Sequence, residues 1–118
     1  NAVLRDWARL GMMMANDGMW DGKRIVPRGW LLAATTVAPG DQHLAPQRAT
    51  RFFGYGYQGW IFPGPRRQFA LLGIHGQSIF VDPEARLVMV QTAAWVSPTG
   101  PRSEAIALWQ ALVERHAE

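Results

Sequence analysis

The 118-residue sequence contains no cysteine, only one lysine (Lys23), and no hydrophobic run approaching the ~20 residues of a membrane-spanning helix. Without cysteine there are no disulfides and no thiolate metal ligands, which fits an oxidising or a reducing compartment. The three histidines, His43, His75 and His116, are each about 30 or more residues apart, with no short-range pair or carboxylate partner that suggests a metal site. We therefore predict no metal, no cofactor and no membrane span.

Acidic residues are also fewer than basic ones, 9 against 12, and the formal net charge is +3. A basic excess can indicate nucleic-acid binding, because arginine and lysine neutralise phosphates. Here the arginines are spread singly or in pairs along the chain, and no aromatic and basic residues form a binding platform. We predict no nucleic-acid partner. The 48% hydrophobic content and six tryptophans instead indicate one globular domain with a substantial core.

The first half of the chain has helical signals. Apolar residues at three- and four-residue steps predict a helix over residues 2–16, ended by Asn16-Asp17-Gly18. Asp21-Gly22 predicts a further turn, and Pro27 suits the first turn of a short helix that extends to Thr36. Residues 37–51 contain proline, glycine and few large apolar side chains, so they predict a loop.

From Phe52 the apolar period changes to two, which predicts a strand up to the breaker Pro63-Gly64-Pro65. Phe53, Tyr55, Tyr57 and Ile61 fall on one face of that strand, and Trp60 and Phe62 on the other. Further strands are predicted at 68–74, 77–82 and 86–94, the last two joined by a turn at Asp82–Ala85. A closing helix presents one apolar stripe to the sheet: Ile106, Trp109, Leu112, Val113 and His116. The predicted fold is α+β: helices, an antiparallel meander of three to four strands, and a C-terminal helix on the sheet.

Residues 54–59 match the dinucleotide-binding pattern G-x-G-x-x-G. That fingerprint requires a helix after the glycines, so that the helix N-terminus meets the pyrophosphate. Here Trp60-Ile61-Phe62-Pro63 follows, which is typical of a strand and then a breaker. We expect no nucleotide site, and infer that the glycines allow close packing against Trp60 or a neighbouring helix.

The most informative stretch is Gly73-Ile74-His75-Gly76-Gln77, a glycine-flanked polar turn between two strand-like runs. Glycines let the backbone approach a ligand, so the Ile74 N–H could face a developing oxyanion. A plain β-turn between strands is the alternative. His75 could form a hydrogen-bonding wall of a site, hold the turn, or act as a general base. Asp82 stands at the far end of the following strand, too far away for a His75–Asp82 dyad.

Residues 69–90 resemble the C-terminal strands of the β-lactamase-fold serine hydrolases, closest to the branch of 6-aminohexanoate-dimer hydrolases and related esterases. Residues 6–27 are similar to the segment that precedes those strands in the same family. The resemblance implies a partial β-lactamase-like fold over residues 1–118, with a helical and loop part at 1–51 and a meander plus closing helix at 52–118. It also implies an N-terminal part of the same protein, absent from this chain, as a partner.

The family nucleophile belongs to a Ser-x-x-Lys motif followed by Tyr-x-Asn or Ser-x-Asn. Neither motif occurs in this sequence, so we expect the chain alone to be inactive. In the complete protein the resemblance implies hydrolysis of a small ester or amide through an acyl-enzyme. The implied site consists of Ile74 as backbone oxyanion donor and His75 as catalytic residues, with Gly73, Gly76 and Gln77 binding substrate. Leu71-Leu72-Gly73 stands where many relatives have Lys-Thr-Gly, which argues against penicillin recognition through that lysine.

A non-catalytic, penicillin-binding-like ligand-binding or interaction domain is the alternative function. A Ser-x-x-Lys motif before Asn1 in the native gene would favour the enzyme, and its loss the binding domain. The resemblance also implies that N-terminal strands pair beside residues 86–94. Without them Leu87–Val90 would be an unpaired apolar edge, so we expect the isolated chain to self-associate.

Overall fold

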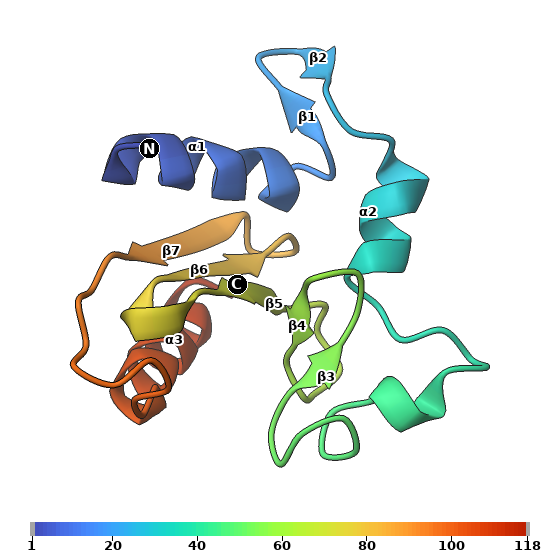
Figure 1. Ribbon diagram of the computed structural model, residues 1–118. Coiled ribbons are helices and arrows are strands. Elements are labelled where there is room, and N and C mark those ends of the chain that lie inside the picture. The colour runs from blue at the N-terminus through green and yellow to red at the C-terminus, as the bar shows by residue number, and fades with distance from the viewer. Residues whose placement is uncertain (1, 118) are drawn as a thin grey trace.

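The computed structural model describes residues 2–117, and its main body is a five-stranded antiparallel sheet between two helices (Figure 1). The elements are α1 (Leu4–Ala15), β1 (Met19–Trp20), β2 (Lys23–Arg24), α2 (Arg28–Ala34), β3 (Gly54–Tyr55), β4 (Trp60–Ile61), β5 (Phe69–Leu72), β6 (Ser78–Asp82), β7 (Leu87–Gln91) and α3 (Ser103–His116), with 3₁₀ turns at Gln42–Leu44 and Ile74–Gly76. Strands β3 to β7 follow one another across the sheet in chain order. The α+β class is confirmed, with five strands where three to four were predicted and with a separate two-stranded sheet, β1–β2, that was not predicted.

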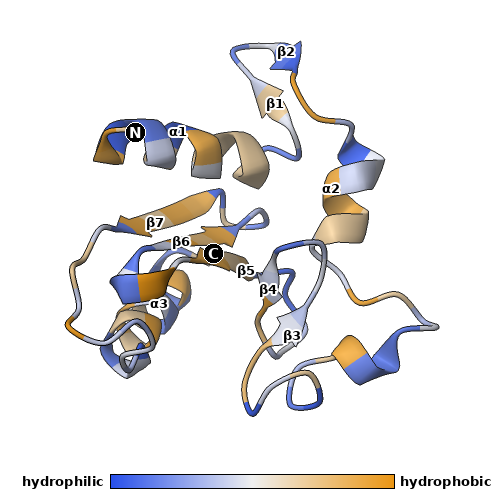
Figure 2. Ribbon diagram, viewed as in Figure 1, coloured by the Kyte–Doolittle hydropathy of each residue, from blue (hydrophilic) through white to orange (hydrophobic). Residues whose placement is uncertain are grey.

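The strands β5 to β7 are mostly apolar (Figure 2), and their residues alternate between the face under α1 and the face under α3, so both faces of the sheet are covered. The face under α1 contains Phe69, Ile79 and Val81, which pack with Ala15 of the helix. The opposite face contains Ala70 and Phe80, where the Phe80 ring stacks on Trp109 of α3 at 5.8 Å. The strands therefore carry continuous apolar runs, as expected for a layer covered on both sides.

Helix α1 packs on the sheet through its C-terminal half. Gly11 is buried, and a Cβ atom there would lie 2.5 Å from Cγ1 of Val88, so glycine permits the close approach of α1 to β7. The predicted apolar face is wrong at its start, since Leu4 is 50% and Trp7 41% exposed. The N-terminal half of α1 projects past the buried part of the sheet and leaves a hollow beneath Trp7.

The predicted single strand over residues 52–62 is wrong. The chain reverses between Gly56 and Gly59, where the Gly56 N–H donates to the Gly59 carbonyl over 2.8 Å and Gln58 has a φ of 62°. Strands β3 and β4 form the resulting hairpin. A Cβ on Gly56 would lie 2.0 Å from the Ala34 carbonyl oxygen, so packing of the hairpin against the end of α2 selects glycine and forces the turn.

Other boundaries differ by a few residues. Strand β7 ends at Gln91 rather than at residue 94, because the chain then leaves the ladder and folds back towards the β5–β6 turn. In α3, Trp109 and Val113 are buried as predicted, whereas His116 is exposed, since it lies beyond the covered part of the sheet. Helix α2 and the loop at 37–51 agree with prediction apart from one 3₁₀ turn. Within residues 2–117 no helix is long and apolar enough to cross a membrane.

Charged groups join the two strands of the β5–β6 hairpin at the end away from its turn. This end is here named the lower end of the hairpin, and the end with the Gly73–Gln77 turn is named the upper end. The Asp82 carboxylate is fully buried and accepts hydrogen bonds from Nε and Nη2 of Arg66, at 3.0 and 3.1 Å. It also accepts one from the Ala85 N–H, which closes the β6–β7 turn. The Asp82 carboxylate favours the charged guanidinium and raises the pKa of Arg66. This pair anchors one end of the β5–β6 hairpin.

Candidate functional site

The predicted glycine-flanked turn joins β5 to β6 at the opposite end of the hairpin. Gly73 is extended (φ −96°, ψ 163°), Ile74 begins a single 3₁₀ turn, and His75 and Gly76 both have positive φ, 58° and 96°. The Gly73 N–H donates to the Gln77 carbonyl over 2.9 Å and closes the loop. Ile74 is the first residue of the turn, so its N–H has no acceptor within that turn, and its side chain is 66% exposed.

The segment after β7 lies against this turn and holds it through backbone bonds. The His75 N–H donates to the Pro98 carbonyl, and the Trp95 N–H donates to the His75 carbonyl, both over 3.0 Å. The His75 ring is bonded at Nδ1 to the Trp95 carbonyl over 2.7 Å. His75 thus makes three hydrogen bonds to the 95–98 segment, which accounts for its left-handed backbone and for a histidine at this position.

The two glycines of the turn are required for different reasons. A Cβ on Gly76 would lie 2.6 Å from Cε2 of the Trp95 indole, and its φ of 96° already disfavours any other residue. Gly73 has an ordinary φ, and a Cβ there would lie 3.1 Å from Oε1 and 3.3 Å from Cβ of Gln77. Gly76 therefore makes room for a tryptophan, whereas a Cβ on Gly73 would require only a small shift of the Gln77 side chain.

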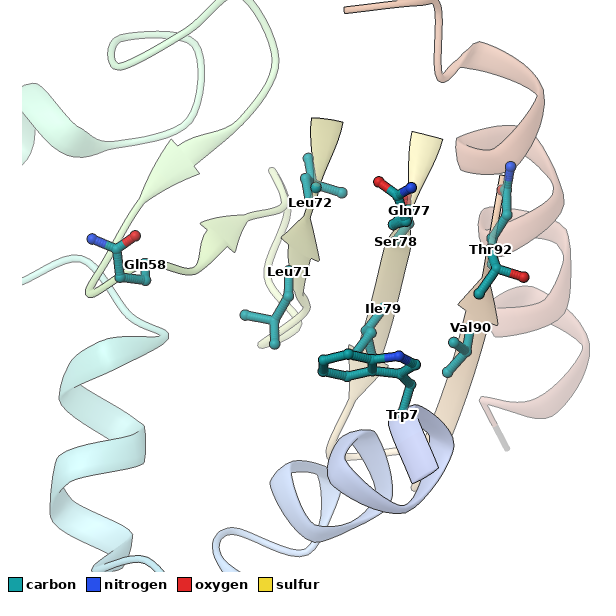
Figure 3. Close-up of a pocket in the computed structure, with 11 residues that line it drawn as sticks. Trp7, Gln58, Leu71, Leu72, Gln77, Ser78, Ile79, Val90 and Thr92 are labelled. Atoms are coloured by element: carbon teal, nitrogen blue, oxygen red, sulfur yellow. The ribbon is translucent and has the colours of Figure 1, made fainter. Parts of the chain in front are cut away.

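Two hollows flank the turn. The first, about 290 Å³, lies on the α1 side of the sheet, where Trp7 extends over Ile79 and Val90 and Gln77 stands at its mouth (Figure 3). The second, about 460 Å³ and here named the Ile74 hollow, lies on the other side. Its walls include Gly73, Ile74, Trp60, Phe53, Thr50 and Arg102. Because Gly73 borders both, the Gly73–Ile74 peptide separates two recesses that a substrate or another part of the protein could enter.

The structure places the predicted site residues unevenly around these recesses. Gly73 and Gln77 border the first hollow, and Gly73 and Ile74 border the Ile74 hollow. His75 and Gly76 border neither, because both are turned towards the 95–98 segment. The Gly73 and His75 N–H groups are bonded within the protein, and the Ile74 N–H is a backbone donor that the turn can present to a recess, with His75 and Gly76 behind it.

Two residues at this site escaped the sequence analysis. Trp95 lies between Gly76 and Gly100, and a Cβ on either glycine would come within 2.7 Å of its ring. The Arg102 guanidinium lies over the same indole, 5.1 Å from the ring centre, and donates to the Gly73 and Gln77 carbonyls. The sequence signal that could have pointed to them is weak: they stand at the two ends of a Pro/Gly-rich turn. That turn follows the predicted site by more than 15 residues.

Other polar groups do not join this site. Asp82 is bonded to Arg66 and Ala85, so it is not a partner of His75. The G-x-G-x-x-G segment forms the β3–β4 hairpin, with no helix directly after it. Gly56 and Gly59 approach Ala34 at the end of α2, as inferred for a neighbouring helix, whereas Gly54 packs against Leu44 and Pro46. In the described part of the chain, no three His, Asp or Glu side chains gather as metal ligands.

No protein-family model matches the chain. It is 33% identical over 102 residues to the 6-aminohexanoate-dimer hydrolase of Paenarthrobacter ureafaciens, in an alignment that covers 83% of this chain and 26% of the relative. A solved structure from Bacillus anthracis, named as a candidate 6-aminohexanoate-dimer hydrolase, matches 99% of the chain with a TM-score of 0.76 and 26% identity, and the match covers 29% of that protein. The chain thus spans about a quarter of the length of these relatives. These similarities support the relationship that the sequence indicates, to a C-terminal segment of a β-lactamase-fold hydrolase, and both relatives are named as 6-aminohexanoate-dimer hydrolases.

Proposed function

We propose that the complete protein is a serine hydrolase that cleaves ester or amide bonds through an acyl-enzyme, and that residues 1–118 form one wall of its substrate cleft. The observation that carries the proposal is the Ile74 N–H. It belongs to the first residue of a tightly held turn, has no acceptor within that turn, and borders a recess. A fixed backbone donor beside a recess is what stabilisation of an oxyanion requires.

In this mechanism the nucleophilic serine and the lysine and tyrosine that activate it lie in the preceding part of the protein. The serine oxygen attacks the substrate carbonyl, whose oxygen gains negative charge and accepts a hydrogen bond from the Ile74 N–H. Gly73 and Gln77 border the substrate. In this proposal His75 is not a general base. It holds the turn in place through its three hydrogen bonds to the 95–98 segment.

Replacing Ile74 by proline in the complete hydrolase tests the oxyanion donor, because proline lacks the N–H. Gly73 is extended at ψ 163°, which suits the residue before a proline. Ile74→Ala is the matched variant, since it shortens the side chain and keeps the N–H. We expect kcat of Ile74→Pro to fall roughly 10²-fold or more below that of Ile74→Ala. Equal turnover of the two folded variants would refute the donor role.

The chain by itself should not hydrolyse p-nitrophenyl esters or nitrocefin above background. Its three serines, Ser78, Ser97 and Ser103, each lack a lysine three residues later, and a serine without an activating base is a weak nucleophile. Stoichiometric labelling of any of them by a fluorophosphonate, seen by mass spectrometry, would contradict this expectation.

We also propose that the isolated chain self-associates through β7. This five-residue strand forms one edge of the sheet and carries no charged residue, whereas natural edges are usually protected by charge or proline. Pairing of β7 with its copy would be antiparallel about a two-fold axis. Sedimentation at micromolar concentration should show a dimer, and a monomer there would show that the edge is protected.

A further inference from the structure

Arg102, the residue before α3, binds the backbone of the turn from the side opposite the α1 face. Its Nη2 donates to the Gly73 carbonyl, and its Nη1 donates to the Ser78 hydroxyl over 2.8 Å and to the Gln77 carbonyl over 3.3 Å. One side chain therefore ties the end of β5, the turn and the start of β6 together. It reaches them from 24 to 29 residues further along the chain.

The positive charge of Arg102 faces neutral oxygen atoms and an aromatic ring. No ion pair within residues 2–117 includes it, and its acceptors are two carbonyls and a hydroxyl, all neutral. The Trp95 indole covers its guanidinium, and burial lowers the pKa of Arg102. Arginine stays charged in such surroundings, so the carbonyl dipoles of the turn must point at it, and this fixes their direction.

That direction matters because the Gly73 carbonyl and the Ile74 N–H belong to the same peptide group. A peptide group is planar and trans, so its C=O and N–H point in opposite directions. Holding the Gly73 oxygen with a charged donor therefore sets where the Ile74 N–H points. A hydrogen bond to the carbonyl also polarises the amide, which strengthens its N–H as a donor.

We propose that Arg102 is a positioning residue that orients the Gly73–Ile74 peptide, so that the Ile74 N–H faces the reacting carbonyl of the substrate. The inference rests on the proposed oxyanion role of Ile74. It assigns a part in turnover to a residue that contacts the carbonyl end of this peptide group rather than its N–H.

The test uses the complete hydrolase with Arg102→Ala, Arg102→Lys and, as control, Arg115→Ala, which removes an exposed arginine at the far end of α3. We expect Arg102→Ala to lower kcat by roughly 10- to 100-fold while KM changes less than about threefold, because the donor serves the transition state more than the bound substrate. Arg102→Lys should recover only part of kcat, since an ammonium cannot bridge all three acceptors. Arg115→Ala should behave as the unmodified enzyme.

A double-mutant cycle with Ile74→Pro separates orientation of the N–H from general support of the fold. Proline keeps the Gly73 carbonyl and removes only the N–H, so in that background Arg102→Ala should lower kcat by less than about threefold. An equal loss in both backgrounds would overturn the inference. If Arg102→Ala does not fold, Arg102→Lys carries the same cycle. Full turnover of Ile74→Pro itself would instead refute the proposed function.

The Ile74 hollow raises a competing role, because Arg102 also borders it and could bind an anionic group of the substrate. A pair of p-nitrophenyl esters of equal length, one ending in a carboxylate and one in a neutral amide, distinguishes the two roles. Positioning predicts the same loss of kcat for both esters in Arg102→Ala. A rise in KM of tenfold or more that is confined to the carboxylate ester would overturn the inference and assign Arg102 to substrate binding.

Discussion

The β5–β6 hairpin is held by an arginine at each end, and the two arginines are held in opposite ways. At the lower end Arg66 meets the fully buried Asp82 carboxylate, and its pKa is raised. At the upper end Arg102 meets only neutral oxygens and an indole face, and its pKa is lowered. The first pair matches charge with charge and stabilises the fold. At the upper end the Arg102 cation binds the carbonyl of the Gly73–Ile74 peptide group. This contact sets the direction of the Ile74 N–H, which is the proposed donor to the substrate.

The largest expected difference is in the unfolding free energy when each of the two arginines is replaced by alanine in the complete protein. Arg66→Ala leaves a buried carboxylate with only the Ala85 N–H as donor, and should cost about 3 kcal/mol of unfolding free energy. Arg102→Ala leaves two carbonyls and the Ser78 hydroxyl without this donor, but no buried charge, and should cost about 1 kcal/mol. Urea denaturation measures both.

The two ends of the hairpin are distinguished more sharply when the loss of unfolding free energy is compared with the loss of kcat in each variant. Arg66→Ala should lower stability most and leave kcat of the folded enzyme nearly unchanged, whereas Arg102→Ala should do the reverse. Similar losses of unfolding free energy in the two variants would show that charge matching is not what separates the two ends.

The glycines of the upper turn provide a second, smaller contrast. Gly76→Ala places a Cβ against the Trp95 indole at a φ of 96°, and should cost about 2 kcal/mol. Gly73→Ala meets the Gln77 side chain at 3.1 Å (Oε1) and 3.3 Å (Cβ) at an ordinary φ, a smaller displacement, and should cost about 1 kcal/mol. Thermal denaturation of the two variants measures the difference. A Gly73→Ala protein that is the less stable of the two would mean that the Trp95 packing is not what requires glycine.

Sequence reasoning located the upper turn because its signal is local. Gly73 and Gly76 bracket Ile74-His75 between two apolar runs, and the α+β order of elements follows from the hydrophobic periodicity. It failed where the cause lies elsewhere in the chain. The reversal at Gly56 depends on contact with the Ala34 carbonyl, and the role of Arg102 depends on a chain that folds back after Gln91. Neither contact leaves a pattern in neighbouring residues.

The smallest effect is expected at Glu84, the second carboxylate near Arg66. Its Oε2 lies 3.5 Å from Nη1 of Arg66 and its side chain is 51% exposed, so water screens the pair. Its Oε1 also accepts the Arg67 N–H over 3.1 Å. Glu84→Gln removes the charge and keeps an oxygen acceptor, so it should cost less than about 0.5 kcal/mol, whereas Glu84→Ala removes both and should cost up to about 1 kcal/mol. Denaturant midpoints at low and high salt separate the two contributions. A salt-sensitive loss above about 1 kcal/mol in Glu84→Gln would show that Glu84 shares the charge of Arg66 with Asp82, and that the lower anchor is a three-residue network.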